Sequence, residues 1–270
     1  LVKKGENKRI RAEALGINRK NIYYKNIQDE KDLLLKQQIE DVHKVHPSYG
    51  HKRLGMHLKI NPKRVRRVMR KIDIKPPRRK VNHYCTKSVP HRKYPNLIKD
   101  YVPTKPNDLW VSDVSFLKFK GKFWYLVTIE DIMTRQVLGT HVSKKHDRYL
   151  VLTAVNEALM RTNKTPMIFH SDQGTEYMAE DVTSFLENLG IQISASDKAS
   201  PWQNGYQESF FGRFKEEFGD INRYETVGEL IEEIYHQIHY YNTQRIHTAL
   251  KMPPTAYANF FRVLSEKMGT

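Results

Sequence analysis

Three apolar runs with strand-like composition, separated by short turns, constrain the fold of this chain more than any other feature. They are LWVSDVSFLKF at 109–119, KFWYLVTIEDI at 122–132 and RQVLGTHVS at 135–143. Strands joined by tight turns pair antiparallel, because a parallel crossover needs about a dozen residues or more. Residues 109–143 are therefore predicted to form an antiparallel meander.

Helices and two further strands alternate after this meander. A helix is expected from about Arg148 to Arg161, with its leucines and Val155 facing inward. The later segments are strand MIFHSD at 167–172, helix DVTSFLENLG at 181–190, strand IQISAS at 191–196, and helices at 204–218 and 229–242. This order predicts an α+β domain with a five-stranded mixed sheet.

The first hundred residues read as short helices separated by turns. In RIRAEALGINRKNIYYK, residues 9–25, an apolar stretch ends at Gly16 and Asn18 can cap a new helix. That arrangement is typical of the second half of a helix-turn-helix. Further helices are expected over 31–46, from about Arg53, and over 61–74.

The excess of positive over negative charge lies entirely in the N-terminal part of this chain. Residues 1–100 hold 28 Lys and Arg against 9 Asp and Glu, whereas residues 101–270 hold 18 against 21. Such asymmetry is expected of a nucleic-acid-binding segment joined to a domain with another task. The alternative is a protein that is merely basic and soluble, such as a ribosomal protein.

The helix over 61–74 concentrates this charge. A charge run is usually a solvated helix face, but six cations surround the apolar face of this one helix, which favours contact with DNA phosphates. In the N-terminal part the residues predicted to bind DNA are Arg19, Lys20, Lys63, Arg64, Arg66, Arg67, Arg70, Arg78, Arg79 and Lys80.

Cysteine usage and hydropathy point to a soluble protein of a reducing compartment. The only cysteine, Cys85, cannot form an intramolecular disulfide, and with His83 and His91 it makes an improbable zinc site. There is no run of about eighteen apolar residues and no signal peptide, so no membrane partner is expected. The chain opens with Leu1 rather than Met, which is compatible with a fragment or with the downstream half of a longer translation product.

Three acids lie at notable positions relative to the predicted strands and helices. Asp113 interrupts an apolar strand, Asp172 follows the strand at 167–171, and Glu208 lies on the helix after the last strand. If they converge, their mutual repulsion calls for divalent metal, and Mg²⁺ prefers such oxygen ligands. Two ions about 4 Å apart could then act on the two oxygens of a phosphodiester. Taken singly, each could also be an edge acid, a strand-exit cap or an exposed helix acid.

These acids stand within motifs that resemble a known family. The motifs are Asn107-x-x-Trp110-x-x-Asp113, FHSDQGTEY, SPWQNGYQESFFGRFKEE and YYNTQRIHTAL, with YGHKRL and PKRVRRVMRK upstream. Together they resemble the transposase of the insertion-sequence-three family, in the DDE transposase and retroviral integrase superfamily. The resemblance covers essentially the whole chain, and with the order of strands and helices it indicates a ribonuclease H-like fold.

The resemblance implies a function and a set of site residues. Asp113, Asp172 and Glu208 match a catalytic triad that binds two Mg²⁺ ions, for which Mn²⁺ is expected to substitute. The implied reaction is 3′-end cleavage and strand transfer through a circular copy-out intermediate, by a cytoplasmic, nucleoid-associated bacterial homo-oligomer on DNA. Its DNA partners would be terminal inverted repeats and a target. Further DNA contacts are implied for Asn204, Lys215, Arg245 and His247, although the last two could instead brace the site.

The same reasoning divides the chain and leaves two alternatives. The parts are a partial helix-turn-helix (1–28), a helical DNA-binding domain (29–76), a basic linker (77–106), an integrase catalytic core (107–225) and a C-terminal helical extension (226–270). The heptad pattern of the family's leucine zipper is missing. The alternatives are a catalytically silent DNA-binding regulator and a ribonuclease H-like nuclease acting on hybrids.

Overall fold

The computed structural model describes residues 8–14, 16, 18, 27–77, 94–196 and 205–268. The chain forms two compact units, Leu1–Pro76 and Pro77–Thr270. In the described ranges, no helix is both long and apolar enough to cross a membrane.

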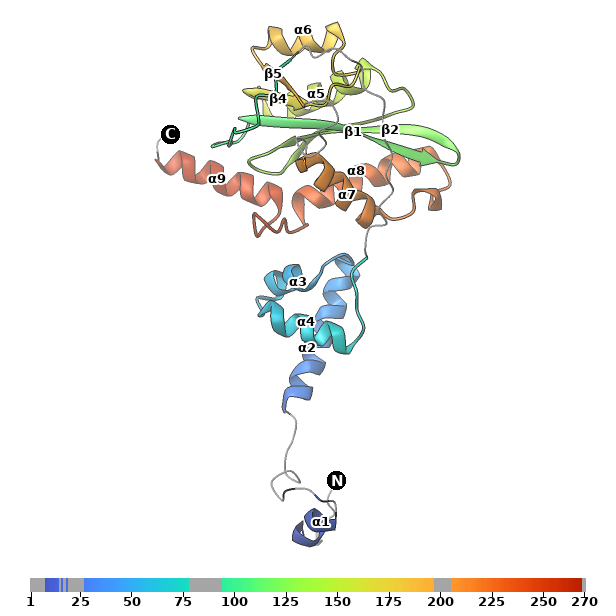
Figure 1. The fold of residues 1–270 in the computed structure, drawn as a ribbon, viewed down its shortest axis with the longest axis vertical. Helices are drawn as coiled ribbons and strands as arrows, with labels where there is room; N and C mark the ends of the chain where they lie inside the picture. The colour runs from blue at the N-terminus through green and yellow to red at the C-terminus, as the bar shows by residue number, and fades with distance from the viewer. Residues whose placement is uncertain are drawn as a thin grey trace. The chain divides into compact units, whose positions relative to one another are not determined.

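The first unit is helical (Figure 1). Its described helices are α1 (Lys8–Ala14), α2 (Ile27–Val45), α3 (His51–Leu58) and α4 (Pro62–Lys71). Helix α4 starts where the sequence predicts, because the Asn61 side chain accepts a hydrogen bond from the Lys63 amide at 2.9 Å and Pro62 takes the first helical position. Leu35, Ile39 and Val65 are fully buried, so the apolar faces of α2 and α4 share one small core.

The second unit is an α+β domain built on one sheet. Its elements are β1 (Leu109–Phe119), β2 (Lys122–Asp131), β3 (Val137–Ser143), α5 (Arg148–Thr162), β4 (Ile168–Ser171), α6 (Glu180–Asn188), β5 (Gln192–Ala195), α7 (Gly205–Phe218), the 3₁₀ turn η3 (Ile221–Arg223), α8 (Val227–Thr243) and α9 (Pro254–Met268). The sheet order is β3-β2-β1-β4-β5. Strands β1 to β3 pair antiparallel, whereas β4 pairs parallel with both β1 and β5. The predicted fold class, a helical region followed by a ribonuclease H-like domain with a five-stranded mixed sheet, is confirmed.

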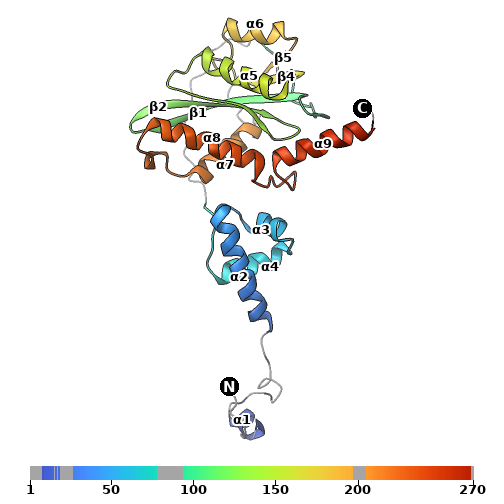
Figure 2. The ribbon, with the colours of Figure 1, turned by 180° about the vertical axis from the view of Figure 1, so that it is seen from behind.

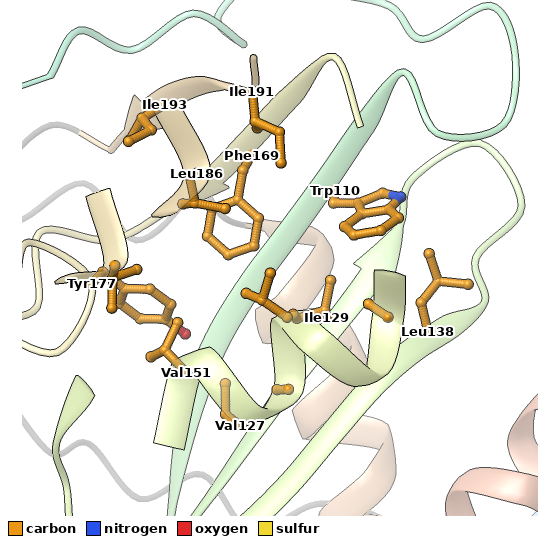
Figure 3. Packing of buried hydrophobic residues seen from close by; sticks show 14 of the residues in the cluster. Trp110, Val127, Ile129, Leu138, Val151, Phe169, Tyr177, Leu186, Ile191 and Ile193 are labelled. Atoms are coloured by element: carbon orange, nitrogen blue, oxygen red, sulfur yellow. The ribbon is translucent and has the colours of Figure 1, made fainter. Parts of the chain in front are cut away.

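Helices cover both faces of this sheet (Figures 1 and 2). Helices α5 and α6 lie on one face, and α7 and α8 lie on the other. On the α5 face, Trp110, Ile129 and Phe169 come from three different strands and pack into one buried cluster with residues of both helices (Figure 3). Burial of that apolar surface stabilises the sheet from which the acidic residues project.

A glycine lets α5 approach the sheet closely. A Cβ atom added at Gly139 in β3 would lie 2.0 Å from the carbonyl oxygen of Ala154 in α5. No side chain can be accommodated at that distance, so Gly139 sets the spacing between this helix and the sheet.

The segment before β1 differs from the extended linker predicted over 77–106. Within its described part, Leu97, Ile98 and Tyr101 pack against a buried cluster that includes Leu109. The Leu97 amide also donates to Ser194 Oγ at 2.8 Å, in β5. Apolar side chains that the basic composition obscured therefore attach residues 94–106 to the second unit.

Candidate active site

Asp113 lies in the middle of β1, opposite Thr128 of β2. It is half-buried, and its carboxylate accepts a hydrogen bond from the Val114 amide at 2.8 Å. Burial raises its pKa to about 7, and the negative charges of Asp172, Glu208 and Glu176 contribute to that rise. Asp113 therefore lies within electrostatic reach of both other acids predicted for the site.

The parallel register of β1 and β4 brings Asp172 beside Asp113. Val111 is aligned with His170. Asp113 comes two residues after Val111, still within β1, and Asp172 comes two residues after His170, just past the end of β4. Neighbouring strands lie about 4.8 Å apart, so equal steps along two parallel strands keep such residues adjacent. Asp172 is exposed at the rim, but the protein around its carboxylate still raises its pKa, an effect that a hydrogen bond from the Gly174 amide (2.9 Å) and the nearby His146 partly offset.

Glu208 reaches the same place from α7, where it lies in the first helical turn. The preceding residue anchors this turn: buried Gln207 accepts from Thr128 Oγ1 at 3.0 Å and donates to the Val111 carbonyl at 2.9 Å. The Gln207 side-chain amide thus joins β1 and β2 next to Asp113 and fixes the first turn of α7 over the sheet. Glu208, the next residue, is held in this turn, and its own side chain is exposed.

The three acids approach one another without forming a closed metal-binding cluster. Outside residues 78–93, 197–204 and the other undescribed positions, no three His, Cys, Asp or Glu side chains are arranged to hold a metal ion. The donor chemistry nevertheless fits a hard cation, because the carboxylates of Asp172, Glu208 and Glu176 all act on Asp113 with negative charge. Metal binding by Asp113, Asp172 and Glu208 stays a prediction.

A fourth acid and a histidine, which the sequence analysis missed, lie next to these residues. Glu176 is buried, with its Oε1 atom 2.9 Å from His146 Nε2. Burial raises the pKa of Glu176, while His146 acts in the opposite direction. Glu176 belongs to the quoted motif FHSDQGTEY and could have been singled out there, but no sequence signal connects it with His146, thirty residues earlier.

The C-terminal residues predicted to contact DNA are placed differently from one another. Arg245 is only 2% exposed, and its guanidinium donates to both carboxylate oxygens of Glu217 at 2.7 to 2.9 Å. This buried pairing joins the end of α8 to α7, which favours the alternative that Arg245 braces the site over direct DNA contact. His247 is half-buried in a bridge to Met252, and Lys215 is exposed in the last turn of α7. DNA contact by these two stays a prediction.

The cations of α4 divide into two groups. Arg67 donates to Asp32 of α2 at 2.7 Å, and Lys71 contacts both Asp29 and Asp32. The hydrogen bond from Arg67 holds the pKa of Asp32 well below its usual range, so Arg67 attaches α4 to α2. DNA contact by Arg67, which is still exposed, stays a prediction. Arg64 donates to the Lys31 carbonyl at 3.3 Å.

The second group of α4 faces solvent. Lys63, Arg66 and Arg70 are exposed. Burial lowers the pKa of His51, and the charges of Arg66, Lys52 and Arg70 lower it further. Cations that repel a neighbouring histidine in this way form a surface suited to anions. The remaining predicted DNA contacts, Arg19, Lys20, Arg78, Arg79, Lys80 and Asn204, lie outside the described residues.

Comparison with known proteins adds an independent line of evidence. Residues 103–201 and 189–254 match two family profiles, each described as an integrase core domain. The transposase for insertion sequence element IS904 of Lactococcus lactis is 33% identical over 195 residues, covering 70% of this chain and 77% of that protein. An uncharacterized transposase-like protein of Haemophilus influenzae is 31% identical over 202 residues, covering 74% and 94%.

Among solved structures, one integrase assembly shares the fold. A chain of the simian T-cell lymphotropic virus intasome, solved with the PP2A regulatory subunit B56 gamma, aligns with a TM-score of 0.52 at 15% identity. The alignment covers 81% of this chain and 73% of that one. At this level of identity the likeness concerns the fold alone.

Proposed function

This chain belongs to the transposases of insertion-sequence-three-like elements that carry an integrase core domain, and we propose that it cleaves and joins DNA strands at the Asp113, Asp172 and Glu208 site. The observation that carries the proposal is the electrostatic coupling of Asp113 to both other acids in a half-buried position. Carboxylates that repel one another at a half-buried position favour an external divalent ion, and Mg²⁺ is the ion that such oxygen donors suit.

The residues of the chain would divide the chemistry between them. Asp113 and Asp172, on adjacent strands, and Glu208, on α7, would hold two Mg²⁺ ions, with Mn²⁺ as a substitute. The bound metal would supply Lewis-acid activation of the attacking oxygen and charge neutralisation at the leaving oxygen. Lys215 and His247 would contact DNA near the site, and Lys63, Arg66 and Arg70 would bind phosphates elsewhere.

The proposed reaction has two displacements of the same kind. Water first attacks the phosphodiester at an element end, the bond to the 3′ oxygen breaks, and that oxygen takes up a proton to become a free 3′ hydroxyl. The hydroxyl then attacks a second phosphodiester and joins to it as another 3′ oxygen leaves. We propose that the second target is first the other end of the element, which gives a circular intermediate, and afterwards a new site. The active form would be a homo-oligomer assembled on the terminal inverted repeats.

Substitution of Asp172 tests the proposal. Asp172→Asn is expected to abolish cleavage of a duplex carrying the terminal repeat and joining of pre-cleaved ends, while binding to the same duplex stays within about twofold, because phosphate contacts determine binding. Cleavage by the purified Asn variant at the wild-type rate would contradict the assignment.

The substrate arms of the same experiment separate the alternatives. A ribonuclease H-like nuclease would cut RNA–DNA hybrids and fail to join pre-cleaved ends. A silent regulator would bind the duplex and show neither reaction with Mg²⁺ or Mn²⁺. The transposase proposal requires joining that depends on added divalent metal.

A further inference from the structure

The turn that follows β4 is supported from a direction that the three-acid site does not explain. Asp172 opens this turn, and its Oδ1 atom accepts a hydrogen bond from the Gly174 amide at 2.9 Å. The Gly174 carbonyl in turn accepts from the Tyr177 and Met178 amides at 3.1 and 3.0 Å. The position of Gly174 therefore determines where one oxygen of the Asp172 carboxylate is held.

Glu176 packs directly over this glycine. A Cβ atom built on Gly174 would lie 2.6 Å from Glu176 Oε1 and 2.7 Å from the other two atoms of that carboxyl group. Only a glycine leaves space for the carboxylate there. The Glu176 side chain thus closes back over the turn instead of pointing away from it.

His146 holds Glu176 in this position. Its Nε2 atom is 2.9 Å from Glu176 Oε1, and its ring stacks on Tyr125 of β2 with centroids 4.7 Å apart and planes 16° from parallel. The ring of Phe116 in β1 is tilted by 57° to the imidazole, with the two centroids 5.4 Å apart. The imidazole is therefore oriented by two aromatic side chains of the same strands that form the sheet beneath Asp113.

We propose that His146 and Glu176 are positioning residues, which through Gly174 hold the Asp172 carboxylate in the orientation needed to bind a divalent cation. The inference rests on the proposed function for the role of the cation. Neither residue is proposed as a metal ligand, because Glu176 Oε1 is engaged with His146. Besides its direct electrostatic effect on Asp172, His146 acts on it through Glu176 and the turn. Groups that orient a ligating carboxylate affect metal affinity even though they do not touch the metal.

The effect of His146 and Glu176 on Asp172 through Gly174 is called the relay below. Four variants of the full chain test this relay, and the measured quantity is affinity for Mn²⁺. His146→Ala and Glu176→Ala are expected to weaken binding about 10- to 100-fold, the usual effect of removing an orienting group. Glu176→Gln keeps an oxygen acceptor for His146 and is expected to restore most of this loss. Gly174→Ala leaves every charge in place, but its methyl group displaces the flexible Glu176 carboxylate, so it should weaken binding like Glu176→Ala.

A matched control and a metal-free readout complete the experiment. Glu187→Gln removes an acid of the same domain that accepts from Tyr94 at 2.8 Å, and it should leave Mn²⁺ binding unchanged. Exchange of the Gly174 amide proton, measured by NMR without metal, should accelerate in His146→Ala, Glu176→Ala and Gly174→Ala, while the Gly219 amide, bonded to the Lys215 carbonyl, should not change.

The outcomes separate the relay from the proposed function. The relay is overturned if Glu176→Gln binds as weakly as Glu176→Ala while His146→Ala is normal, since Glu176 would then act by its own charge. It is also overturned if Gly174 exchange is unaffected, or if lost metal binding merely follows a lowered melting temperature. A wild-type chain that binds Mn²⁺ no better than Asp172→Asn would contradict the proposed function instead, and the Gly174 amide would still decide the relay.

Discussion

In the N-terminal unit, the buried acid Asp32 lies against Arg67 and Lys71, whereas in the second unit Asp113 lies among other acids. The hydrogen bond from Arg67 lowers the pKa of Asp32, whereas burial, reinforced by the neighbouring acids, raises the pKa of Asp113. A charge compensated inside the protein contributes to folding, while charges of one sign gathered without a partner destabilise the fold unless an external ion binds. The contrast indicates where function lies: in the acids of the second unit, and in Lys63, Arg66 and Arg70 of the first unit, which are exposed and form no ion pair with an acid among the described residues.

The strongest test of this contrast is Asp113→Asn. Because metal-based stabilisation of the transition state amounts to several kcal/mol, strand joining should fall about 10³-fold or more. The melting temperature at pH 8 without metal should not fall, since the substitution removes a charge that is repelled in the folded state. Joining assays and calorimetry on one preparation measure both effects, and a variant that is inactive because it is unfolded would contradict the expectation.

The pH dependence of stability should have opposite signs in the two units. In the second unit, Glu130 of β2 is 3% exposed, and burial raises its pKa from 4.5 to about 8. The unfolded chain releases this proton near pH 4.5 and the folded chain only near pH 8, so stability falls as pH rises through that window. Glu130→Gln should remove the share of this slope that Glu130 contributes, while Asp113 and the other acids with raised pKa values keep theirs. It should gain about 3 kcal/mol at pH 8.5, from about 1.4 kcal/mol per pKa unit reduced for relaxation of the buried site.

Hydrogen exchange measured separately for peptides of each unit checks this expectation. A wild-type second unit that is equally protected at pH 5 and pH 8.5, or a Glu130→Gln variant that gains nothing at the higher pH, would contradict it. Peptides of α2 and α4 serve as the internal control because Glu130 lies outside that unit.

In the first unit, the expected sign is reversed. The pKa of Asp32 is lowered below its ordinary value of 3.8, so its contribution to stability is present above about pH 4 and is lost as pH falls further. Asp32→Asn should cost about 2 kcal/mol at pH 7, since hydrogen bonds to charged groups contribute about 1.5 to 3 kcal/mol. Exchange protection in α2 and α4 is the measurement, and unchanged protection there would show that the ion pairs contribute nothing.

The smallest expected effect separates the two groups of cations on α4. Replacing Arg66 and Arg70 together by Gln should weaken DNA binding about tenfold and reduce the salt slope of log affinity by about 2, one per phosphate contact. Arg67→Gln, the matched control, should lower the stability of the unit and leave the salt slope unchanged. Equal salt slopes for both variants would mean that the division of these cations is not functional.

Sequence alone predicted the order of strands and helices and the adjacency of Asp113 and Asp172, for a physical reason. Alternation in β1 and the apolar segment before Asp172 reveal two buried strands, and once these are neighbours their acids must be adjacent. The pairing of cations could not be predicted in this way. Nothing near Arg245 indicates that it is buried against Glu217, and nothing near Arg67 indicates Asp32 as its partner 35 residues earlier, because such contacts depend on how helices pack.

The role proposed for His146 could not be predicted from the sequence, for a related reason. Its neighbours Tyr125, Phe116 and Glu176 come from β2, β1 and the turn after β4, so only the folded arrangement brings them together. The prediction of an extended linker differs from the structure over residues 94–106 for another reason. Basic residues dominate the composition of the predicted linker, whereas a few apolar side chains determine where residues 94–106 lie.

The alignment of Val111 with His170 has a consequence for how this molecule can vary. The register of β1 and β4 sets the separation between Asp113 and Asp172, so a substitution that keeps the core packing of residues such as Trp110 and Phe169 leaves it unchanged, whereas a change in strand length does not. Deleting a single residue between Val111 and Asp113 would turn the acid toward the α5 side of the sheet. We therefore expect length changes in natural variants to accumulate in the connecting loops. A one-residue deletion in β1 should abolish strand joining more reliably than most substitutions in that strand.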